Sequence, residues 1–471
     1  FEGALGETQG AFSSQERPMG DNKIRSEYLV CKLSDEMKGA TKIDAELFKR
    51  LDVKRGLRNE DGTGVLAGLT NIGDVVGYER DENGNLIPIN GRLYYRGYEV
   101  SDLATTAMNE GRFGFEEVAY LLLSGRLPDA EELASFQDLL RDNMPLEHQT
   151  IMHIIELEGS NIMNILARSV LEFYTFDKNP DDVSRDNLMR QSIELISKIP
   201  ATIAYAYNML RHAEQGKTLH LRHPQENLSF AENFLYMLKG SDYTPLEART
   251  LDLLLIVHAE HGGGNNSTFT VRVTSSAGTD TYSSIAAGIG SLKGPLHGGA
   301  NLKVRAMLKY IREHLKDLND QKALEKLLTK ILKKEAFDGA GLIYGIGHAV
   351  YTLSDPRAEL LKKMAAELAK EKGREEEFEF LLRFEKIAAE TIYKVKGRKK
   401  DLCANVDLYS GFVYDLIGIP EEIYTPLFAM SRIVGWCAHR NEELNFQGRR
   451  IIRPAYRCVT DENYYVKLED R

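Results

Sequence analysis

Apolar residues recur every three or four positions through most of the chain after residue 115, and this spacing places them on one face of an α-helix. It predicts helices over residues 115–123, 130–141, 188–210, 230–238 and 245–258. A second group has charged faces with Glu and Lys four residues apart, typical of helices with one exposed side. It comprises residues 303–318, 321–334, 357–371 and 377–395. The pattern therefore predicts a mainly α fold.

The first hundred residues have a different pattern. Residues 27–51 favour one or two short helices. Residues 86–95 alternate apolar and polar positions around Asn90-Gly91, a dipeptide that favours a tight turn between two strands. We therefore expect a small N-terminal β-hairpin that turns at these two residues, as the only substantial β-structure of the chain.

The composition of the chain argues against several classes of function. The chain has 471 residues and a formal net charge of -10, which argues against general nucleic-acid binding because that needs a basic patch or stripe. No run of about 18 apolar residues occurs, so we expect no membrane span. The four cysteines lie far apart without a CxxC pair, which indicates neither a disulfide framework nor a zinc site. A reducing, cytoplasmic location is the simplest expectation.

Residues 1–22 are rich in Gly, Ser, Gln and Glu. They have no apolar segment of the kind that marks a secretory signal, and their acidic residues do not suit a transit peptide. We expect a flexible arm or a cloning remnant there.

Two histidines and one aspartate lie in loop-forming segments, and such groups can move protons at neutral pH. His297 lies in Gly-Pro-Leu-His-Gly-Gly-Ala-Asn, His348 in Gly-Ile-Gly-His-Ala-Val-Tyr and Asp407 in Asn-Val-Asp. The glycines next to His297 let the backbone approach a ligand closely. A helix starting at about Asn301 would place its N-terminal dipole near the His297 ring and favour the neutral imidazole.

Asp407 stands among mostly apolar neighbours, and burial there would raise its pKa and make it a stronger base. The alternative for the same residue is structural, since Asp407 would also suit the N-cap of a helix over residues 408–416. A lone loop histidine is likewise more often a solvated surface group. The occurrence of all three segments in this order favours a catalytic role.

These three segments resemble the signature segments of the citrate synthase family, and similarity of varying strength runs from about Arg55 to Arg457. The resemblance implies a two-domain helical fold with the active site in the cleft between the domains. The small domain would span residues 297–412, and the large domain residues 23–296 and 413–471.

Members of this family condense acetyl-CoA with oxaloacetate and water to citrate and CoA, a step of the tricarboxylic acid cycle. The resemblance implies this acyltransferase activity here, through an enol or enolate intermediate. Asp407 would take a proton from the acetyl methyl group, His297 would donate to the thioester carbonyl, and His348 would donate to the keto oxygen of oxaloacetate. Acetyl-CoA would be a co-substrate, with no permanently bound cofactor and no metal.

Oxaloacetate carries two carboxylates, and planar guanidinium groups bind carboxylates well. By resemblance, Arg357, Arg432 and Arg453 would hold them. His261 and Asn265 would also bind this substrate. The family takes its last arginine from the neighbouring subunit, so Arg453 implies a homodimer with shared active sites.

The resemblance also implies contacts with CoA. They are Gly345 and Gly347, whose backbone would approach the coenzyme, together with Asn405 and Lys400. Lys400 matches a lysine that meets the coenzyme phosphates in some relatives. Position 352 is threonine where other members carry an arginine, so part of that phosphate contact is missing or supplied elsewhere.

Three other readings stay open. A 2-methylcitrate synthase would use the same residues with propionyl-CoA, and a methyl-sized difference in a pocket is worth only about 1–3 kcal/mol. A relative without activity would bind citrate or CoA as a sensor or assembly partner. A metal site on His258 and His261, with Glu260 between them, would need both histidines on one helix face and a third ligand, which is not evident nearby.

Overall fold

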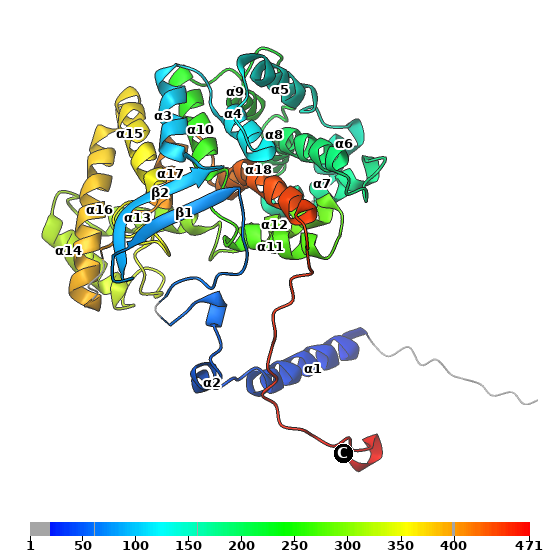
Figure 1. The fold of residues 1–471 in the computed structure, drawn as a ribbon. Coiled ribbons are helices and arrows are strands. Elements are labelled where there is room, and N and C mark those ends of the chain that lie inside the picture. The colour runs from blue at the N-terminus through cyan, green and yellow to red at the C-terminus, as the bar shows by residue number, and fades with distance from the viewer. Residues whose placement is uncertain (1–18, 61, 158, 398–400) are drawn as a thin grey trace, which may run out of the picture. The chain divides into compact units, whose positions relative to one another are not determined.

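The computed structural model describes residues 19–60, 62–157, 159–397 and 401–471. They form two compact units (Figure 1): one holds the described residues up to Leu66 together with residues 454–471, and the other is residues 67–453. Eighteen α-helices and one small sheet occur in the described residues, so the mainly α prediction is confirmed. None of these helices is long and apolar enough to cross a membrane.

The first unit contains α1 (Met19–Ala40), α2 (Ala45–Arg50), and two short 3-10 helices, η1 (Arg55–Leu57) and η3 (Leu468–Asp470). The short helices predicted within residues 27–51 are thus confirmed. α1 begins inside the segment expected to be an arm, and residues 1–18 lie outside the described residues. No described side chain of this unit is buried. Its exposed large apolar side chains include Tyr28, Leu29, Leu33, Met37, Tyr456, Tyr464, Tyr465 and Leu468.

The second unit begins with an antiparallel sheet of three strands, β1 (Gly73–Arg80), β2 (Leu86–Tyr95) and β3 (Tyr98–Glu99), in the order β1-β2-β3. The hairpin is confirmed, but its predicted turn is wrong because Asn90 and Gly91 both lie within β2. The chain turns instead at residues 81–85. There the Asp81 carboxylate accepts two backbone N–H groups and Gly84 takes a left-handed φ of 81°.

Close packing, and not a turn, explains the glycine at position 91. A Cβ atom there would lie 2.3 Å from the Ser354 carbonyl oxygen and 2.5 Å from a ring carbon of Tyr351. The Gly91 N–H also donates to that carbonyl oxygen at 3.2 Å. β2 therefore packs directly against residues 350–354, the segment that follows His348.

The rest of the second unit is helical (Figure 1). Its α-helices are α3 (Val100–Asn109), α4 (Phe115–Ser124), α5 (Ala130–Asp142), α6 (His148–Glu156), α7 (Ile162–Phe176), α8 (Arg185–Gln215), α9 (Phe230–Lys239), α10 (Pro245–His258), α11 (Asn266–Ser276), α12 (Thr281–Lys293), α13 (Ala300–His314), α14 (Gln321–Leu332), α15 (Pro356–Glu371), α16 (Glu375–Lys396), α17 (Val406–Ile417) and α18 (Tyr424–Asn445). The 3-10 helix η2 (Glu421–Ile423) precedes α18. All nine helices predicted from the apolar period are present, with ends that shift by up to five residues.

α10 leads into the candidate site, and its sequence defines both of its ends. The Thr244 side chain accepts the Glu247 N–H, the Glu247 side chain accepts the Thr244 N–H, and Pro245 occupies the first helical position. The helix ends at His258. Residues 259–265 then pass without regular structure to α11.

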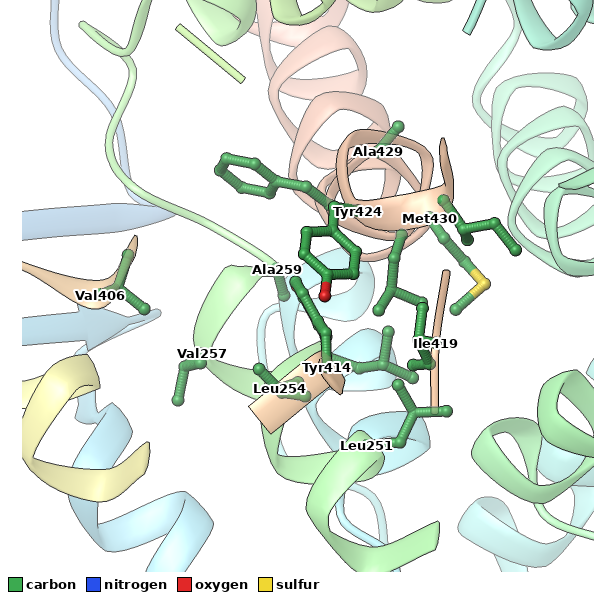
Figure 2. Close-up of a cluster of buried hydrophobic side chains, with 14 of the residues drawn as sticks. Leu251, Leu254, Val257, Ala259, Val406, Tyr414, Ile419, Tyr424, Ala429 and Met430 are labelled. Carbon is green, nitrogen blue, oxygen red and sulfur yellow. The ribbon is translucent and has the colours of Figure 1, made fainter. Parts of the chain in front are cut away.

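α18 is the central helix of the second unit and packs against α4, α7, α8, α10, α11 and α12. Every residue from Tyr424 to Arg440 on it is buried. Figure 2 shows part of this core, where Leu254 of α10, Tyr414 of α17 and Met430 of α18 lie among other buried apolar side chains. Burying such a side chain contributes about 1.5–3 kcal/mol. The core fixes α10, α17 and α18 relative to one another, and each of them leads to a candidate site residue.

Periodicity did not predict α11 and α12, because small polar residues take buried positions on them. Ser267, Thr268 and Ser275 of α11 and Ser284 of α12 are fully buried. A hydroxyl on a helix can bond to the carbonyl one turn earlier, as Ser284 does with Asp280 at 3.0 Å. Such residues therefore line a closely packed interface without leaving an apolar pattern in the sequence.

Candidate active site

The segments that carry His348 and Asp407 are joined through their backbones. Ile346 and Ala404 form an isolated antiparallel bridge, and two backbone hydrogen bonds of 2.8 and 2.9 Å flank it. Gly345 takes a left-handed φ of 85°, which glycine adopts without strain. The bridge places the loop of one candidate donor beside the start of the helix that carries the candidate base.

Asn405 caps the start of α17. Its side-chain oxygen accepts the Asp407 N–H at 3.1 Å, and its amide group donates to Gly347 O at 2.9 Å. Both ends of this side chain are therefore used within the loop. Asp407 is the second residue of the helix, so the alternative in which Asp407 serves as the cap is wrong.

Burial raises the pKa of Asp407 to about 6; Arg357 and Arg432 oppose the rise, and the charge of Asp355 adds to it. The increase that the apolar neighbours of Asp407 predicted is confirmed. At neutral pH the group is mostly ionised, yet it binds a proton more tightly than a solvated carboxylate does. That combination suits a general base.

Arg357 and Asp355 form a buried ion pair at the start of α15. Arg357 Nε and Nη2 donate to the two carboxylate oxygens at 3.0 and 2.8 Å. Asp355 also accepts the backbone N–H of Val406, at the start of α17. Burial alone would raise the pKa of Asp355, but Arg357 outweighs it and holds that pKa below its ordinary value. The ion pair therefore fixes one guanidinium group next to the helix that carries Asp407.

The proton position on His348 follows from its backbone contacts. Nδ1 accepts the N–H groups of Val350 and Tyr351, both at 3.1 Å, and the ring stacks on that of Tyr351 with 4.6 Å between centroids. A ring nitrogen that accepts a hydrogen bond carries no proton in the neutral imidazole. The proton of neutral His348 therefore lies on Nε2, and Nε2–H is its donor.

His261 lies edge-on to His348, with 5.2 Å between the ring centroids. Its Nε2 is buried and has no hydrogen-bond partner among the described residues. Burial and then the charge of Arg357 hold the pKa of His261 well below its ordinary value, so the ring is neutral. Asn265, at the start of α11, accepts the Ser267 hydroxyl at 3.0 Å.

His297 is also neutral, because burial and then Arg432 lower its pKa to about 4. The Ser267 N–H donates to its Nε2 at 3.3 Å, and Ser267 Oγ lies 3.0 Å from the same nitrogen. Because a backbone N–H can only donate, Nε2 is the acceptor and the proton of the ring lies on Nδ1. Ser267 is the second residue of α11, where backbone N–H groups have no partner inside the helix. The helix after His297 does begin near the predicted place, at Ala300, but it is α11 whose N-terminus contacts the ring.

Arg432 is fully buried in the middle of α18. Its Nε donates to His258 O at 2.6 Å, and its guanidinium group lies 4.8 Å from the centroid of the Phe428 ring. Nη1 and Nη2 are buried and have no hydrogen-bond partner within the part of the chain that the structure describes. Burial lowers the pKa of Arg432 to about 10, so the group stays charged at neutral pH.

The predicted site residue Lys400 lies outside the described residues. Arg453 is not part of this cluster. Arg453 is exposed, and the preceding residue, Ile452, donates its N–H to Ser276 Oγ at 3.1 Å. The backbone next to Arg453 is therefore anchored at the end of α11, while the side chain is at the surface.

The structure does not support the alternative of a metal site on His258 and His261. α10 ends at His258, so His258 and His261 do not share one helix face. The Nδ1 atom of His258 lies 2.8 Å from Leu254 O, and Glu260 faces His439 instead. Among the residues that the structure describes, no group of three or more His, Cys, Asp or Glu side chains is arranged to hold a metal ion.

A cavity of about 270 Å³ lies next to His348. Its wall is mostly apolar, and among the described residues that line it Lys396, at the end of α16, is the one lysine. The lining residues are Leu332, Leu342, Ile343, Ile346, Gly347, His348, Ala349, Ile392, Lys396 and Leu402. The motifs in the sequence missed Lys396, because a lysine at the end of a helix is common and gives no signal of its own.

Comparison with known proteins adds to this geometry. The family model described as "Citrate synthase, C-terminal domain" matches residues 61–455. "Citrate synthase 2" of Bacillus subtilis (strain 168) is 36% identical over 386 residues, which cover 81% of this chain and 94% of the relative.

Two solved structures are similar as well. The citrate synthase of Thermotoga maritima MSB8 has a TM-score of 0.70 and 30% identity, over 89% of this chain and 99% of its own. The citrate synthase of Thermoplasma acidophilum, solved in a ternary complex with carboxymethyl coenzyme A and oxaloacetate, has a TM-score of 0.72 and 27% identity, over 89% and 99%.

Replacing Asp407 by Asn removes a group whose pKa is about 6 in the folded chain and about 4 in an unfolded one. Between about pH 4 and 6 the folded parent binds more protons than the unfolded chain, so its stability falls as the pH rises. Asp407→Asn avoids this loss, which is at most about 3 kcal/mol. We expect the variant to melt at a higher temperature than the parent at about pH 7.5, by a difference that shrinks toward about pH 4.5. Thermal unfolding at both pH values measures it, and a Tm difference independent of pH would contradict the raised pKa of Asp407.

Proposed function

The chain belongs to the citrate synthase family of acyltransferases, and we propose that it condenses acetyl-CoA with oxaloacetate and water to form citrate and free CoA. One observation carries the proposal: the buried guanidinium group of Arg432 has two nitrogens without a partner among the described residues. Leaving a buried charged donor unpaired is costly, so the site suits a substrate that brings carboxylates. We choose acetyl-CoA over propionyl-CoA because the compared relatives carry the name citrate synthase.

Oxaloacetate would bind through its two carboxylates. The Nη1 and Nη2 atoms of Arg432 form a planar pair of donors that matches one carboxylate. Arg357, already held by Asp355 through Nε and Nη2, has Nη1 to offer to the other carboxylate. His261 and Asn265 complete this half of the site as hydrogen-bonding groups.

The first chemical step is the removal of a proton from the acetyl methyl group. Asp407 takes this proton, because its raised pKa makes it a stronger base than a solvated carboxylate. At the same time His297 donates from Nδ1–H to the thioester carbonyl oxygen and stabilises the enol or enolate that forms. The Ser267 N–H, by occupying Nε2, keeps the donor on Nδ1.

The second step forms the carbon–carbon bond. His348 donates from Nε2–H to the keto oxygen of oxaloacetate, which makes the keto carbon more electrophilic. The enol carbon attacks that carbon, and the keto oxygen takes up a proton and becomes the citrate hydroxyl group. Water then adds to the thioester carbonyl of citryl-CoA, and CoA leaves as the free thiol.

CoA would bind next to His348. The cavity of about 270 Å³ is apolar enough for an adenine ring or part of the pantetheine chain, and Lys396 at its wall offers a positive charge for a phosphate. Gly345 and Gly347 let the backbone approach the coenzyme, Lys400 would add a polar contact, and Asn405 would act by holding Gly347 in place through its amide group.

We propose a homodimer with shared sites. No described side chain of the first unit is buried, and it exposes many large apolar residues, which a second copy of the chain would cover. Arg453 is the last residue of the second unit, and the residue before it is anchored to α11. From that position we assign it to the active site of the partner subunit.

The domain division that the resemblance implies is part of the same proposal. Residues 297–412 would form the small domain and move against the rest of the second unit to close over the substrates.

We also propose a cytoplasmic location, because all four cysteines are unpaired, as expected in a reducing compartment.

Replacing His297, His348 or Asp407 by Ala tests the proposed chemistry. Each variant loses one group used in proton transfer, and such a group typically contributes about 10²–10⁴-fold to the rate. Release of the CoA thiol from acetyl-CoA and oxaloacetate measures turnover. His314→Ala is the matched control: His314 is exposed at the end of α13, so the variant should keep the parent rate. A well-folded Asp407→Ala protein with near-parent turnover would show that Asp407 is not the base.

Mixed dimers test the shared site. An Arg453→Ala chain and a His348→Ala chain should each be inactive alone, because each lacks one group of every site. In a heterodimer one of the two sites combines an intact His348 with an intact Arg453 from the other chain. Activity should therefore return to about half of the parent value per heterodimer. Verified heterodimers as inactive as the two single variants would show that Arg453 does not act across the interface.

A further inference from the structure

The segment between α10 and α11, residues 259–265, carries His261 and Asn265 but has no regular structure to hold it. A substrate-binding loop must be fixed within a fraction of an ångström to be effective. Glu260, which the proposed chemistry does not use, is the second residue of this segment and is fully buried.

Glu260 is tied into the core through its side chain and its backbone. Its Oε1 accepts the Gly262 N–H and lies 2.9 Å from His439 Nε2. The Tyr95 hydroxyl donates to the Glu260 carbonyl oxygen at 3.1 Å. The Glu260 carboxylate therefore fixes the backbone after His261, and the Tyr95 hydroxyl fixes the backbone before it.

His439 is fully buried on α18, two turns after Arg432. Its Nδ1 accepts a hydrogen bond from Arg272 Nε at 2.9 Å, so Nε2 carries the proton and donates to Glu260. Arg272, on α11, also donates to Glu443 at 2.7 Å. A continuous set of hydrogen bonds thus runs from the substrate-binding segment to α18 and α11.

The slot that holds Glu260 has no spare room. A Cβ atom at Gly73 would lie 2.7 Å from Glu260 Cγ, and one at Gly435 would come still closer to Glu260 Oε2. Only glycine fits these two positions, one on β1 and the other on α18. The side chain is therefore confined from both sides as well as hydrogen-bonded.

The charge of Glu260 also acts on Arg432. Within the described ranges, Glu260 Oε2 is buried without a hydrogen-bond partner, as are Nη1 and Nη2 of Arg432. Burial lowers the pKa of Arg432, and Glu260 is the strongest influence that opposes this decrease. While no substrate carboxylate is bound, Glu260 is thus the negative charge that stabilises the charged form of Arg432 most strongly.

We propose that Glu260 and His439 form a positioning pair, which holds residues 259–265 so that His261 and Asn265 face the substrate and compensates the charge of Arg432 while the site is empty. The inference rests on the proposed function, because it assigns the pair to the oxaloacetate half of that site. It adds two residues that touch neither substrate and act through His261 and Arg432.

His439→Leu tests the positioning role, because it removes both hydrogen bonds of the ring. We expect the Kd for oxaloacetate, measured by calorimetry, to rise at least about tenfold, since small displacements of binding groups cost this much or more. The KM for acetyl-CoA at saturating oxaloacetate should change less than about twofold. His439→Gln, whose amide group can replace both hydrogen bonds, should stay within about threefold of the parent.

Arg440→Gln is the matched control. Arg440 follows His439 on the same helix, is equally buried and bonds to Thr281, Ser275 and Ser284, away from the substrate groups. Its loss should lower the Tm but leave the Kd for oxaloacetate within about twofold. A folded His439→Leu protein with the parent Kd would overturn the inference, and so would an Arg440→Gln protein that weakens binding as much as His439→Leu.

Glu260→Gln removes the negative charge of the side chain but nearly keeps its shape. The variant keeps an acceptor for the Gly262 N–H but leaves Arg432 without its buried counter-charge. The unliganded protein should therefore have a lower Tm than the parent, and saturating oxaloacetate should remove most of this difference. An unliganded Tm equal to that of the parent would contradict the role of the charge. Turnover of the parent protein tests the proposed function. The changes in Kd and Tm from parent to variant test the positioning pair, so either proposal can fail while the other holds.

Discussion

The guanidinium group of Arg432, whose Nη1 and Nη2 have no hydrogen-bond partner among the described residues, is the constraint on which the site depends. A charged group with two unpaired nitrogens is expensive to bury, and the fold keeps it buried by fixing everything around it. The end of α10 supplies a carbonyl oxygen for Nε, the Phe428 ring covers one face, and Glu260 supplies a negative charge. The packing of α10, α17 and α18 thus holds in place the groups that stabilise the buried charge of Arg432.

Backbone amides decide where the protons of the site lie. The two histidines assigned to proton donation have one ring nitrogen occupied by backbone N–H groups, from the first turn of α11 for His297 and from Val350 and Tyr351 for His348. The donor is therefore Nδ1–H in the first and Nε2–H in the second. Asp407, the proposed base, differs because its raised proton affinity comes from burial on α17. Main-chain geometry and burial, not extra catalytic side chains, prepare these three groups.

The sequence predicted the helices with regular apolar periods, and it singled out the three segments that carry His297, His348 and Asp407, because both leave local patterns. It did not predict the true place of the hairpin turn, since Gly91 is required by the distant Ser354 and not by its neighbours. Nor did it predict that Ser267 would contact His297 or that Glu260 would pair with His439, 179 residues further along the chain. Such contacts depend on which helices pack together, and buried small polar residues on α11 hide that information.

Binding of dicarboxylates to the substrate-free protein tests the central claim most directly. Calorimetry should compare oxaloacetate with pyruvate, which has the same keto group but only one carboxylate. Two charge-assisted hydrogen bonds to the second carboxylate are worth about 3 kcal/mol or more, so the account predicts that oxaloacetate binds at least about a hundredfold more tightly. Equal affinities for the two keto acids would contradict it, because one of the two guanidinium groups assigned to oxaloacetate, that of Arg357 or of Arg432, would then bind no carboxylate.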